Sequence, residues 1–88
     1  MTLKKILKVN NRLGLHARPA ALFVQTASRF KCIVKVAKDD VEVNGKSMMG
    51  LMMLAAEQGS ALTITLDGDD ATEALREIED VFARNFGE

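Results

Sequence analysis

The clearest pattern along the chain is an alternation of apolar and polar residues, which is typical of strands buried on one face. The alternation is regular in residues 60–66 and in residues 32–38. It is less regular in residues 3–9, where Ile6 falls on the same side as the lysines, and it is brief in residues 41–43. These four stretches predict four strands.

Apolar residues spaced three and four positions apart predict a helix that includes Pro19. The apolar stripe runs from Ala20 to Ala27. Proline is favoured in the first turn of a helix because its φ is fixed and it has no N–H to donate. We therefore expect this helix to begin at Ala17 or Arg18.

A second apolar stripe, from Ala71 to Phe82, predicts the last helix. Charged residues occupy most of its remaining positions, as in a helix with one side in solvent. Asp70 and Glu73 have the spacing of a capping box, in which the first side chain accepts from an amide of the first turn. We expect Asp70 to cap this helix.

Ser47 is well placed as the N-cap of a shorter helix that begins at Met48. Its hydroxyl can accept from the amides that the first turn leaves free. Residues 48–56 are apolar throughout, and Gly59 fits the C′ position that would end such a helix. The sequence therefore predicts an apolar helix that stops just before Gly59.

This apolar helix cannot be buried on every side in so small a domain. Leu51 and Leu54 are spaced to face inward together. That arrangement leaves Met48, Met49 and Met52 at or near the surface, where flexible and polarisable side chains suit a partner-binding face. The alternative is that these methionines only fill irregular space in the core.

Taken in order, the predicted elements are β-α-β-β-α-β-α, which indicates an α+β domain with a sheet partly covered by helices. The chain has 88 residues, of which 48% are hydrophobic and 27% charged. We expect residues 1–88 to form one domain, because a chain of this size cannot divide its core.

Charge and cysteine content exclude several classes of function. Lys plus Arg and Asp plus Glu number 12 each, so no overall field favours nucleic acid or an anionic membrane. Cys32 is the only cysteine, which excludes an internal disulfide. Nothing at the start resembles a signal peptide, and no apolar run approaches the roughly 20 residues that span a bilayer. We expect a cytoplasmic protein without membrane insertion.

The candidate chemistry lies in residues 14–21, which contain the only histidine and the only proline of the chain. If the helix begins at Ala17 or Arg18, its free amides and the positive end of its dipole point toward His16, which is the geometry of an anion site. Arg18 adds positive charge, and a neutral imidazole is a nucleophile that can hold a covalent group. The stretch therefore predicts a histidine that carries a phosphoryl group, with an ordinary capping role as the alternative.

Residues 14–21, Gly-Leu-His-Ala-Arg-Pro-Ala-Ala, closely resemble the phosphorylation-site motif of HPr, the histidine-containing phosphocarrier family of the phosphoenolpyruvate-dependent sugar phosphotransferase system. Residues 46–52, Lys-Ser-Met-Met-Gly-Leu-Met, resemble the regulatory-serine region of the same family. The resemblance covers essentially the whole chain. It implies an open-faced sandwich, with a four-stranded antiparallel sheet and three helices packed on one face.

The resemblance also implies a mechanism. Nδ1 of His16 would accept a phosphoryl group from phosphorylated enzyme I and pass it to the IIA domains of sugar permeases. Arg18 would neutralise phosphate charge, the amides of the first turn at Ala17 would orient the phosphate, and Pro19 would fix the turn. Such a carrier needs no cofactor and no metal, and the chain has no second histidine to help bind one.

For Ser47 the resemblance implies a regulatory role beside the structural one. In many members of the family the matching serine is phosphorylated by an HPr kinase/phosphorylase that consumes ATP. A phosphate on Ser47 would add negative charge to an apolar surface and weaken the docking of enzyme I.

The sequence is also compatible with other functions. A nitrogen-related paralogue also has the active histidine, so His16 does not separate the two branches, whereas a catabolite-repression paralogue that lacks it is excluded. A non-catalytic interaction module would use the methionine helix and leave His16 as an incidental cap. A stand-alone enzyme would need further acid or base groups near His16, and only Arg18 is close in sequence. We expect a monomer, because no symmetric interface is evident.

Overall fold

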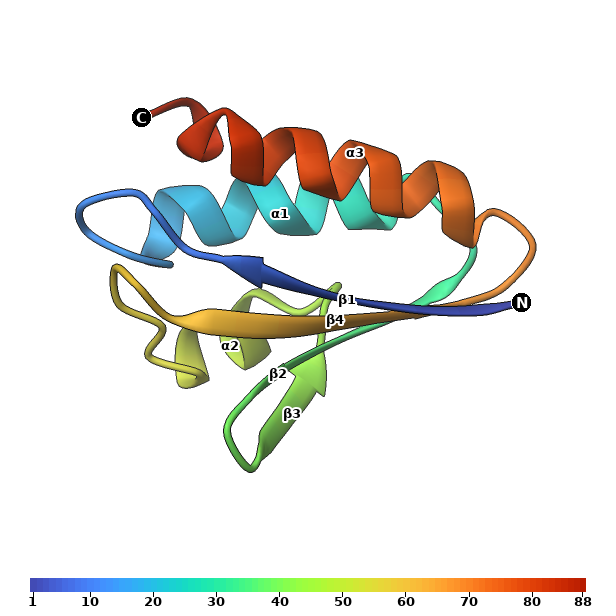
Figure 1. The fold of residues 1–88 in the computed structure, drawn as a ribbon, viewed down its shortest axis with the longest axis horizontal. Helices are drawn as coiled ribbons and strands as arrows, with labels where there is room; N and C mark the ends of the chain where they lie inside the picture. The colour runs from blue at the N-terminus through green and yellow to red at the C-terminus, as the bar shows by residue number, and fades with distance from the viewer.

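The computed structural model describes residues 1–88, and its strands and α-helices follow the predicted order (Figure 1). Each predicted strand boundary lies within one residue of the observed boundary. The elements are β1 (Thr2–Lys8), α1 (Ala17–Ser28), β2 (Ile33–Lys38), β3 (Val41–Asn44), α2 (Met48–Met53), β4 (Ala61–Asp67), α3 (Ala71–Ala83) and the 3-10 helix η1 (Asn85–Gly87).

The strands form one antiparallel sheet in the order β1-β4-β2-β3. β4 lies between two partners, and its Ile64 pairs with Lys5 of β1 and Val36 of β2. Leu62, Ile64 and Leu66 alternate along β4 and are at most 1% exposed. The apolar residues of this alternation therefore lie on the face of the sheet that the helices cover.

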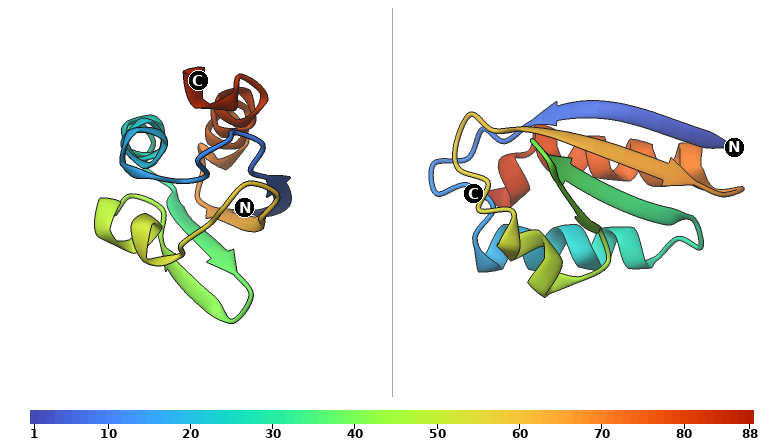
Figure 2. Two further views of the ribbon diagram at one scale, coloured as in Figure 1. Left: turned by 90° about the vertical axis from the view of Figure 1, so that its left-hand side faces the viewer. Right: turned by 90° about the horizontal axis from the view of Figure 1, so that it is seen from below.

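The helices cover one face of the sheet. α1 and α3 run antiparallel and side by side across it, and α2 packs near β3 and α1 (Figures 1 and 2). The opposite face is open, and Ile6 of β1 and Ile33 of β2 are 67% and 58% exposed. The open-faced sandwich that the resemblance implied is confirmed.

Aromatic packing joins α1, α3 and η1 within the core. The ring of Phe23 meets that of Phe82 edge-on with centroids 6.2 Å apart, and the Phe82 and Phe86 centroids are 4.8 Å apart. All three side chains are at most 5% exposed. Burial of a side chain of this size contributes about 1.5–3 kcal/mol, so these rings hold η1 against the two long helices.

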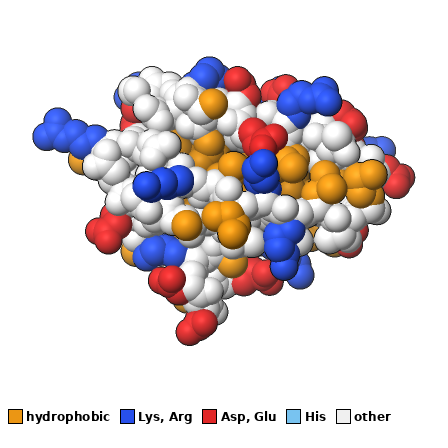
Figure 3. Space-filling view, in the orientation of Figure 1, with side chains coloured by type: hydrophobic (Ala, Val, Ile, Leu, Met, Phe, Trp, Pro, Cys, Tyr) orange, Lys and Arg blue, Asp and Glu red, His pale blue; other side chains and the backbone are white.

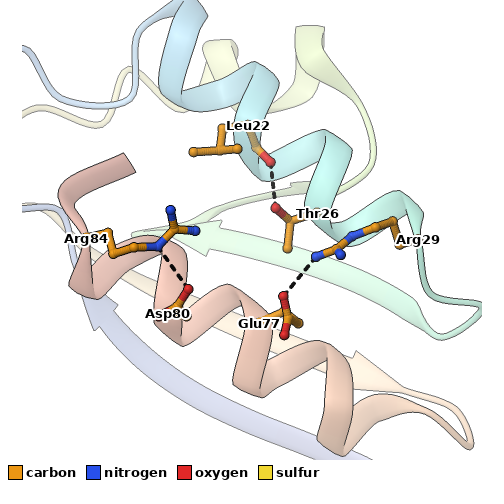
Figure 4. A network of polar contacts seen from close by, with 6 residues as sticks. All are labelled: Leu22, Thr26, Arg29, Glu77, Asp80 and Arg84. Carbon is orange, nitrogen blue, oxygen red and sulfur yellow. Dashed lines mark hydrogen bonds and ion pairs between the residues drawn. The ribbon is translucent and has the colours of Figure 1, made fainter. Parts of the chain in front are cut away.

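One ion pair adds a smaller link between α1 and α3, and a further hydrogen bond lies within α1 (Figure 4). Arg29, at the end of α1, lies 2.9 Å from a carboxylate oxygen of Glu77 on α3. Thr26 is buried, and its hydroxyl donates to the carbonyl of Leu22 at 2.9 Å. Exposed ion pairs contribute about 0–1 kcal/mol, so the aromatic core rather than the Arg29 pair sets the packing of these helices.

The capping box predicted at the start of α3 is wrong. Asp70 occupies the N-cap position, but its side chain makes no bond to the first turn. Its carboxylate instead accepts from the amides of Lys31 at 2.8 Å and Cys32 at 2.9 Å. These bonds, the one from Lys31 foremost, hold the pKa of Asp70 below its ordinary value. Asp70 therefore ties the start of α3 to the segment that enters β2.

The prediction that the methionine helix ends just before Gly59 is also wrong. α2 ends at Met53, and Ala55, rather than a glycine, has a left-handed φ of 50°. Gly59 lies in the turn before β4 with a φ of 94°. Because the chain leaves the helix early, the carbonyl of the buried Ala56 is free to accept from Leu15.

The surface carries charges of both signs. Acidic and basic side chains are interspersed on the face seen in Figure 3, in keeping with 12 of each in the sequence. Cys32 is buried directly before β2. None of the helices is both long enough and apolar enough to cross a membrane.

Candidate functional site

His16 immediately precedes α1, which begins at Ala17 as predicted. Its backbone is extended, with φ −81° and ψ −170°, and its side chain does not cap the helix. Ala20 donates to the carbonyl of His16 at 3.0 Å. The amides of Ala17 and Arg18 therefore precede the helical hydrogen bonds, and the positive end of the helix dipole lies beside His16.

A glycine allows the loop before His16 to lie against the segment that follows α2. Gly14 has a φ of +71°, and a Cβ there would collide with the carbonyl oxygen of Ala56 and lie 2.8 Å from Cα of Glu57. Leu15 is buried and donates its amide to the carbonyl of Ala56 at 2.8 Å. These contacts hold the loop that leads into His16 against the segment after α2.

The structure adds to the site a carboxylate that the sequence analysis missed. Oε2 of Glu88 lies 3.0 Å from Nε2 of His16, and Oε1 of Glu88 accepts from Nδ2 of Asn11 at 3.0 Å. Asn11 is buried and also donates to the carbonyl of Gly14 at 2.6 Å. Asn11 thus holds both the histidine loop and the carboxylate that faces the ring. No local motif could reveal this contact, because 72 residues separate His16 from Glu88.

The segment that carries Glu88 has an uncommon backbone. Asn85, Phe86 and Gly87 have successive positive φ values of 52°, 57° and 76°. A left-handed conformation costs about 1–2 kcal/mol for a residue such as phenylalanine, whereas glycine and asparagine adopt it more readily. Phe86 is 4% exposed, and its burial offsets a cost of this size. The packing of Phe86 therefore presents the Glu88 carboxylate to His16.

The contact with Glu88 distinguishes the two ring nitrogens of His16. Nε2 faces the carboxylate, whereas Nδ1 has no hydrogen-bond partner. A carboxylate that accepts from Nε2–H leaves the lone pair of Nδ1 available. Partial burial alone would raise the pKa of Glu88, but the bonds from Asn11 and His16, with the charges of His16 and Arg18, outweigh that effect and lower it. Glu88 is therefore ionised at neutral pH.

Arg18 and Pro19 complete the start of α1. Pro19 is buried in the first turn, where the sequence predicted it. Arg18 is exposed and forms no ion pair. Its guanidinium can therefore turn toward an anion on the His16 ring without first breaking another contact.

The exposed side of α2 lies next to His16. Met49, Met52 and Met53 are 75%, 47% and 69% exposed. Met52 and His16 line the same shallow hollow, together with Leu13, Leu15, Ala55, Ala56 and Glu57. The structure therefore joins the methionine surface and the histidine, which the sequence analysis identified separately.

The inner side of α2 packs into the core. Leu51 and Leu54 are 0% and 4% exposed, so the predicted inward pair is confirmed. Met48 is half-buried and packs against the core. It offers less surface to a partner than Met49 and Met52 do. For Met48, the alternative interpretation that the methionines fill space in the core therefore holds.

Ser47 caps α2 as predicted. Its Oγ accepts from the amide of Gly50 at 3.0 Å, and Met48 is the first helical residue. The preceding Lys46 donates from Nζ to the carbonyl of Phe30 at 2.6 Å. Ser47 therefore lies at the opposite end of α2 from Met52, the methionine that borders His16.

Comparison with known proteins points to a single family. Residues 3–84 match the family model described as the PTS HPr component phosphorylation site. The chain is 51% identical over 86 residues to the phosphocarrier protein HPr of Neisseria meningitidis. The matched stretch covers 98% of this chain and 97% of that protein. The crystal structure of HPr-C-His from Thermoanaerobacter tengcongensis is similar with a TM-score of 0.94 at 45% identity, over 98% of this chain and 97% of the other. A crystal structure of an HPr dimer from the same organism has a TM-score of 0.80 at 48% identity, over 93% and 94% of the two chains.

Proposed function

The chain belongs to the HPr family, the phosphocarriers of the phosphotransferase system, and on this premise we propose that His16 is the residue that carries the phosphoryl group. The observation that carries the proposal is the pairing of Nε2 of His16 with Glu88, which leaves Nδ1 free at the start of α1. An available ring nitrogen beside free helix amides suits a phosphorylated histidine.

In the proposed transfer, the lone pair of Nδ1 attacks the phosphorus of a phosphorylated donor. The N–P bond forms while the bond between phosphorus and the donor atom breaks, and the donor atom keeps the bonding electrons. The proton stays on Nε2, where the Glu88 carboxylate accepts its hydrogen bond and offsets the positive charge that develops on the ring. The reverse sequence delivers the group to an acceptor.

The start of α1 would stabilise the transferred phosphate. The amides of Ala17 and Arg18 and the helix dipole favour negative charge there, Arg18 supplies a mobile cation, and Pro19 fixes the turn. Ala17 and Arg18 are exposed, so they stabilise the phosphohistidine without making its onward transfer strongly unfavourable. We infer a carrier that hands the group between partners rather than an enzyme that completes a reaction alone.

Family membership suggests the partners. We infer that phosphorylated enzyme I is the donor and that IIA domains of sugar permeases are the acceptors, all in the cytoplasm. Met49, Met52 and Met53 provide an exposed and adaptable apolar surface near the histidine. We propose that the monomer is the working unit, although a relative from Thermoanaerobacter tengcongensis has been solved as a dimer.

We also infer a regulatory phosphorylation at Ser47 by an HPr kinase/phosphorylase and ATP. Its support is the resemblance of residues 46–52 to the regulatory-serine region of the family. The phosphate would add about −1.5 to −2 charges to the end of α2 and so weaken docking on the methionine surface. Peptide mapping after incubation with a bacterial HPr kinase tests this, and an unmodified Ser47 would contradict it.

The carrier proposal is tested by intact mass after incubation with phosphoenolpyruvate and a bacterial enzyme I of proven activity. The parent protein should gain one acid-labile phosphoryl group, and the His16→Ala variant should gain none. The variant should still bind enzyme I, because the methionine surface remains. If the variant gains as much phosphate as the parent, the phosphorylated residue is not His16. If the parent gains no phosphate, the chain acts as a binding module.

A further inference from the structure

Most methionine side chains of this chain lie outside its core, and Met48 alone packs against it. Four of the five lie within α2, and none of the five is buried. Met49, Met53 and Met52 are 75%, 69% and 47% exposed. The fully buried positions of the core are occupied instead by Leu, Ile, Val, Phe, Ala, Pro and one Cys. A chemical change at the thioethers of Met49, Met52 and Met53 would therefore alter the surface and leave the core packing intact.

These thioethers lie where a change of polarity affects the site. Met52 borders the hollow that also contains His16, and Met49 and Met53 extend the same exposed side of α2. Under the function proposed above, a partner that reaches His16 must cover this surface and remove water from it. The polarity of the three sulfur atoms therefore enters directly into docking.

We propose that Met49, Met52 and Met53 form a reversible oxidation site at which peroxide suppresses docking at His16. This inference rests on the carrier function proposed above. The thioether sulfur attacks one oxygen of hydrogen peroxide, the S–O bond forms, the O–O bond breaks, and water leaves after a proton transfer. The sulfide is oxidised by two electrons to a sulfoxide, and the peroxide is reduced to water. Methionine sulfoxide reductases reverse the change.

The sulfoxide would weaken docking because it replaces an apolar group with a strong hydrogen-bond acceptor. A polar group buried without a partner loses its hydration without compensation. A surface shaped to accept thioethers offers the new oxygen no matched donor, so the interface is destabilised. Transfer to and from His16 would slow even though the ring, Arg18 and Glu88 are unchanged.

The single cysteine does not compete for the oxidant. Cys32 is 2% exposed, and burial, followed by the neighbouring Asp70 carboxylate, raises its pKa. The reactive thiolate is therefore scarce and shielded. The accessible sulfur atoms of the domain are those of the methionines.

The test measures phosphoryl uptake from phosphoenolpyruvate through enzyme I before and after treatment with hydrogen peroxide. Peptide mapping should find one added oxygen on each of Met49, Met52 and Met53. The apparent kcat/KM for uptake should fall about tenfold, as expected for the burial of unpaired polar groups, while the unfolding midpoint stays unchanged. Treatment with methionine sulfoxide reductases should restore the rate.

Two variants make the test specific. The combined Met49→Leu, Met52→Leu and Met53→Leu variant should keep its own untreated rate after peroxide, whatever that rate is. Cys32→Ala should lose activity on oxidation as the parent does. A fully oxidised parent with undiminished uptake, or a triple leucine variant that loses the same share, would overturn the oxidation site. No uptake before any peroxide would instead contradict the carrier function itself.

Discussion

Oε2 of Glu88 lies 3.0 Å from Nε2 of His16, although 72 residues separate them in the sequence. The pairing joins the segment after α3 to the start of α1. It assigns the two imidazole nitrogens different environments, because the carboxylate holds one and leaves the other free.

Replacement of Glu88 by glutamine should change the response of stability to acid. The pKa of Glu88 in the folded protein lies below its ordinary value of 4.5. Its contribution is therefore present above about pH 4.5 and is lost as the pH falls through the folded pKa. The parent should have a higher unfolding midpoint than Glu88→Gln at neutral pH, and the difference should shrink as the pH falls below 4.5.

The matched control for this experiment is Glu57→Gln. Glu57 is exposed and forms no ion pair, so its replacement should leave the midpoint unchanged at every pH. If the unfolding midpoint of Glu88→Gln also equals that of the parent at every pH, the contact with His16 contributes nothing to stability.

Replacement of Gly14 by alanine should disturb both stability and phosphoryl uptake. The φ of +71° and the collision of the new Cβ with Ala56 both oppose the change. The backbone strain alone should reduce the free energy of unfolding by about 1–3 kcal/mol, and the collision should add to this loss. Phosphoryl uptake at His16 should also be slower. Gly59→Ala has a positive φ but open space, so it should cost only about 1–2 kcal/mol. Equal losses by urea unfolding would contradict the role of the Ala56 contact.

Removal of the Ser47 cap should destabilise α2. The Ser47→Ala variant loses the acceptor for the amide of Gly50 and should unfold with about 1 kcal/mol less free energy, within about 0.5–2 kcal/mol. Ser47→Asp keeps an acceptor at the N-cap and should recover most of this loss. Urea unfolding of the two variants checks the prediction, and an alanine variant as stable as the parent would refute it.

The two sides of α2 should respond differently to truncation. Leu51 is 0% exposed, so Leu51→Ala should reduce the free energy of unfolding by about 2–5 kcal/mol. Met49 is 75% exposed, and Met49→Ala should stay within about 0.5 kcal/mol of the parent. Denaturant titrations measure both values. Comparable losses would mean that Met49 packs more closely than its exposure indicates.

Local patterns were sufficient to predict the order of the elements and the bounds of the strands. Leu62, Ile64 and Leu66 alternate in the sequence because side chains of a strand alternate between faces, and all three are buried. Ser47 caps α2, and Pro19 lies in the first turn of α1. These effects act on groups within about one turn of the residue itself, so a short stretch of sequence contains the information.

Contacts between distant segments could not be predicted in the same way. Asp70 has the spacing of a cap, yet folding brings the amides of Lys31 and Cys32 to its carboxylate. The methionine helix lacks a local reason to stop at Met53. It stops there in a fold where the next segment pairs with the histidine loop through Ala56.

The sequence by itself determined the order of the elements and the location of a histidine beside an arginine and a proline at the head of a helix. Its resemblance to HPr also indicated the family. Only the tertiary structure decided that Glu88 faces Nε2 of His16 and that Met52 borders the same hollow. The physical reason is range. Periodicity and capping depend on neighbours along the chain, whereas the environment of a reactive nitrogen depends on groups that meet only after the chain has folded.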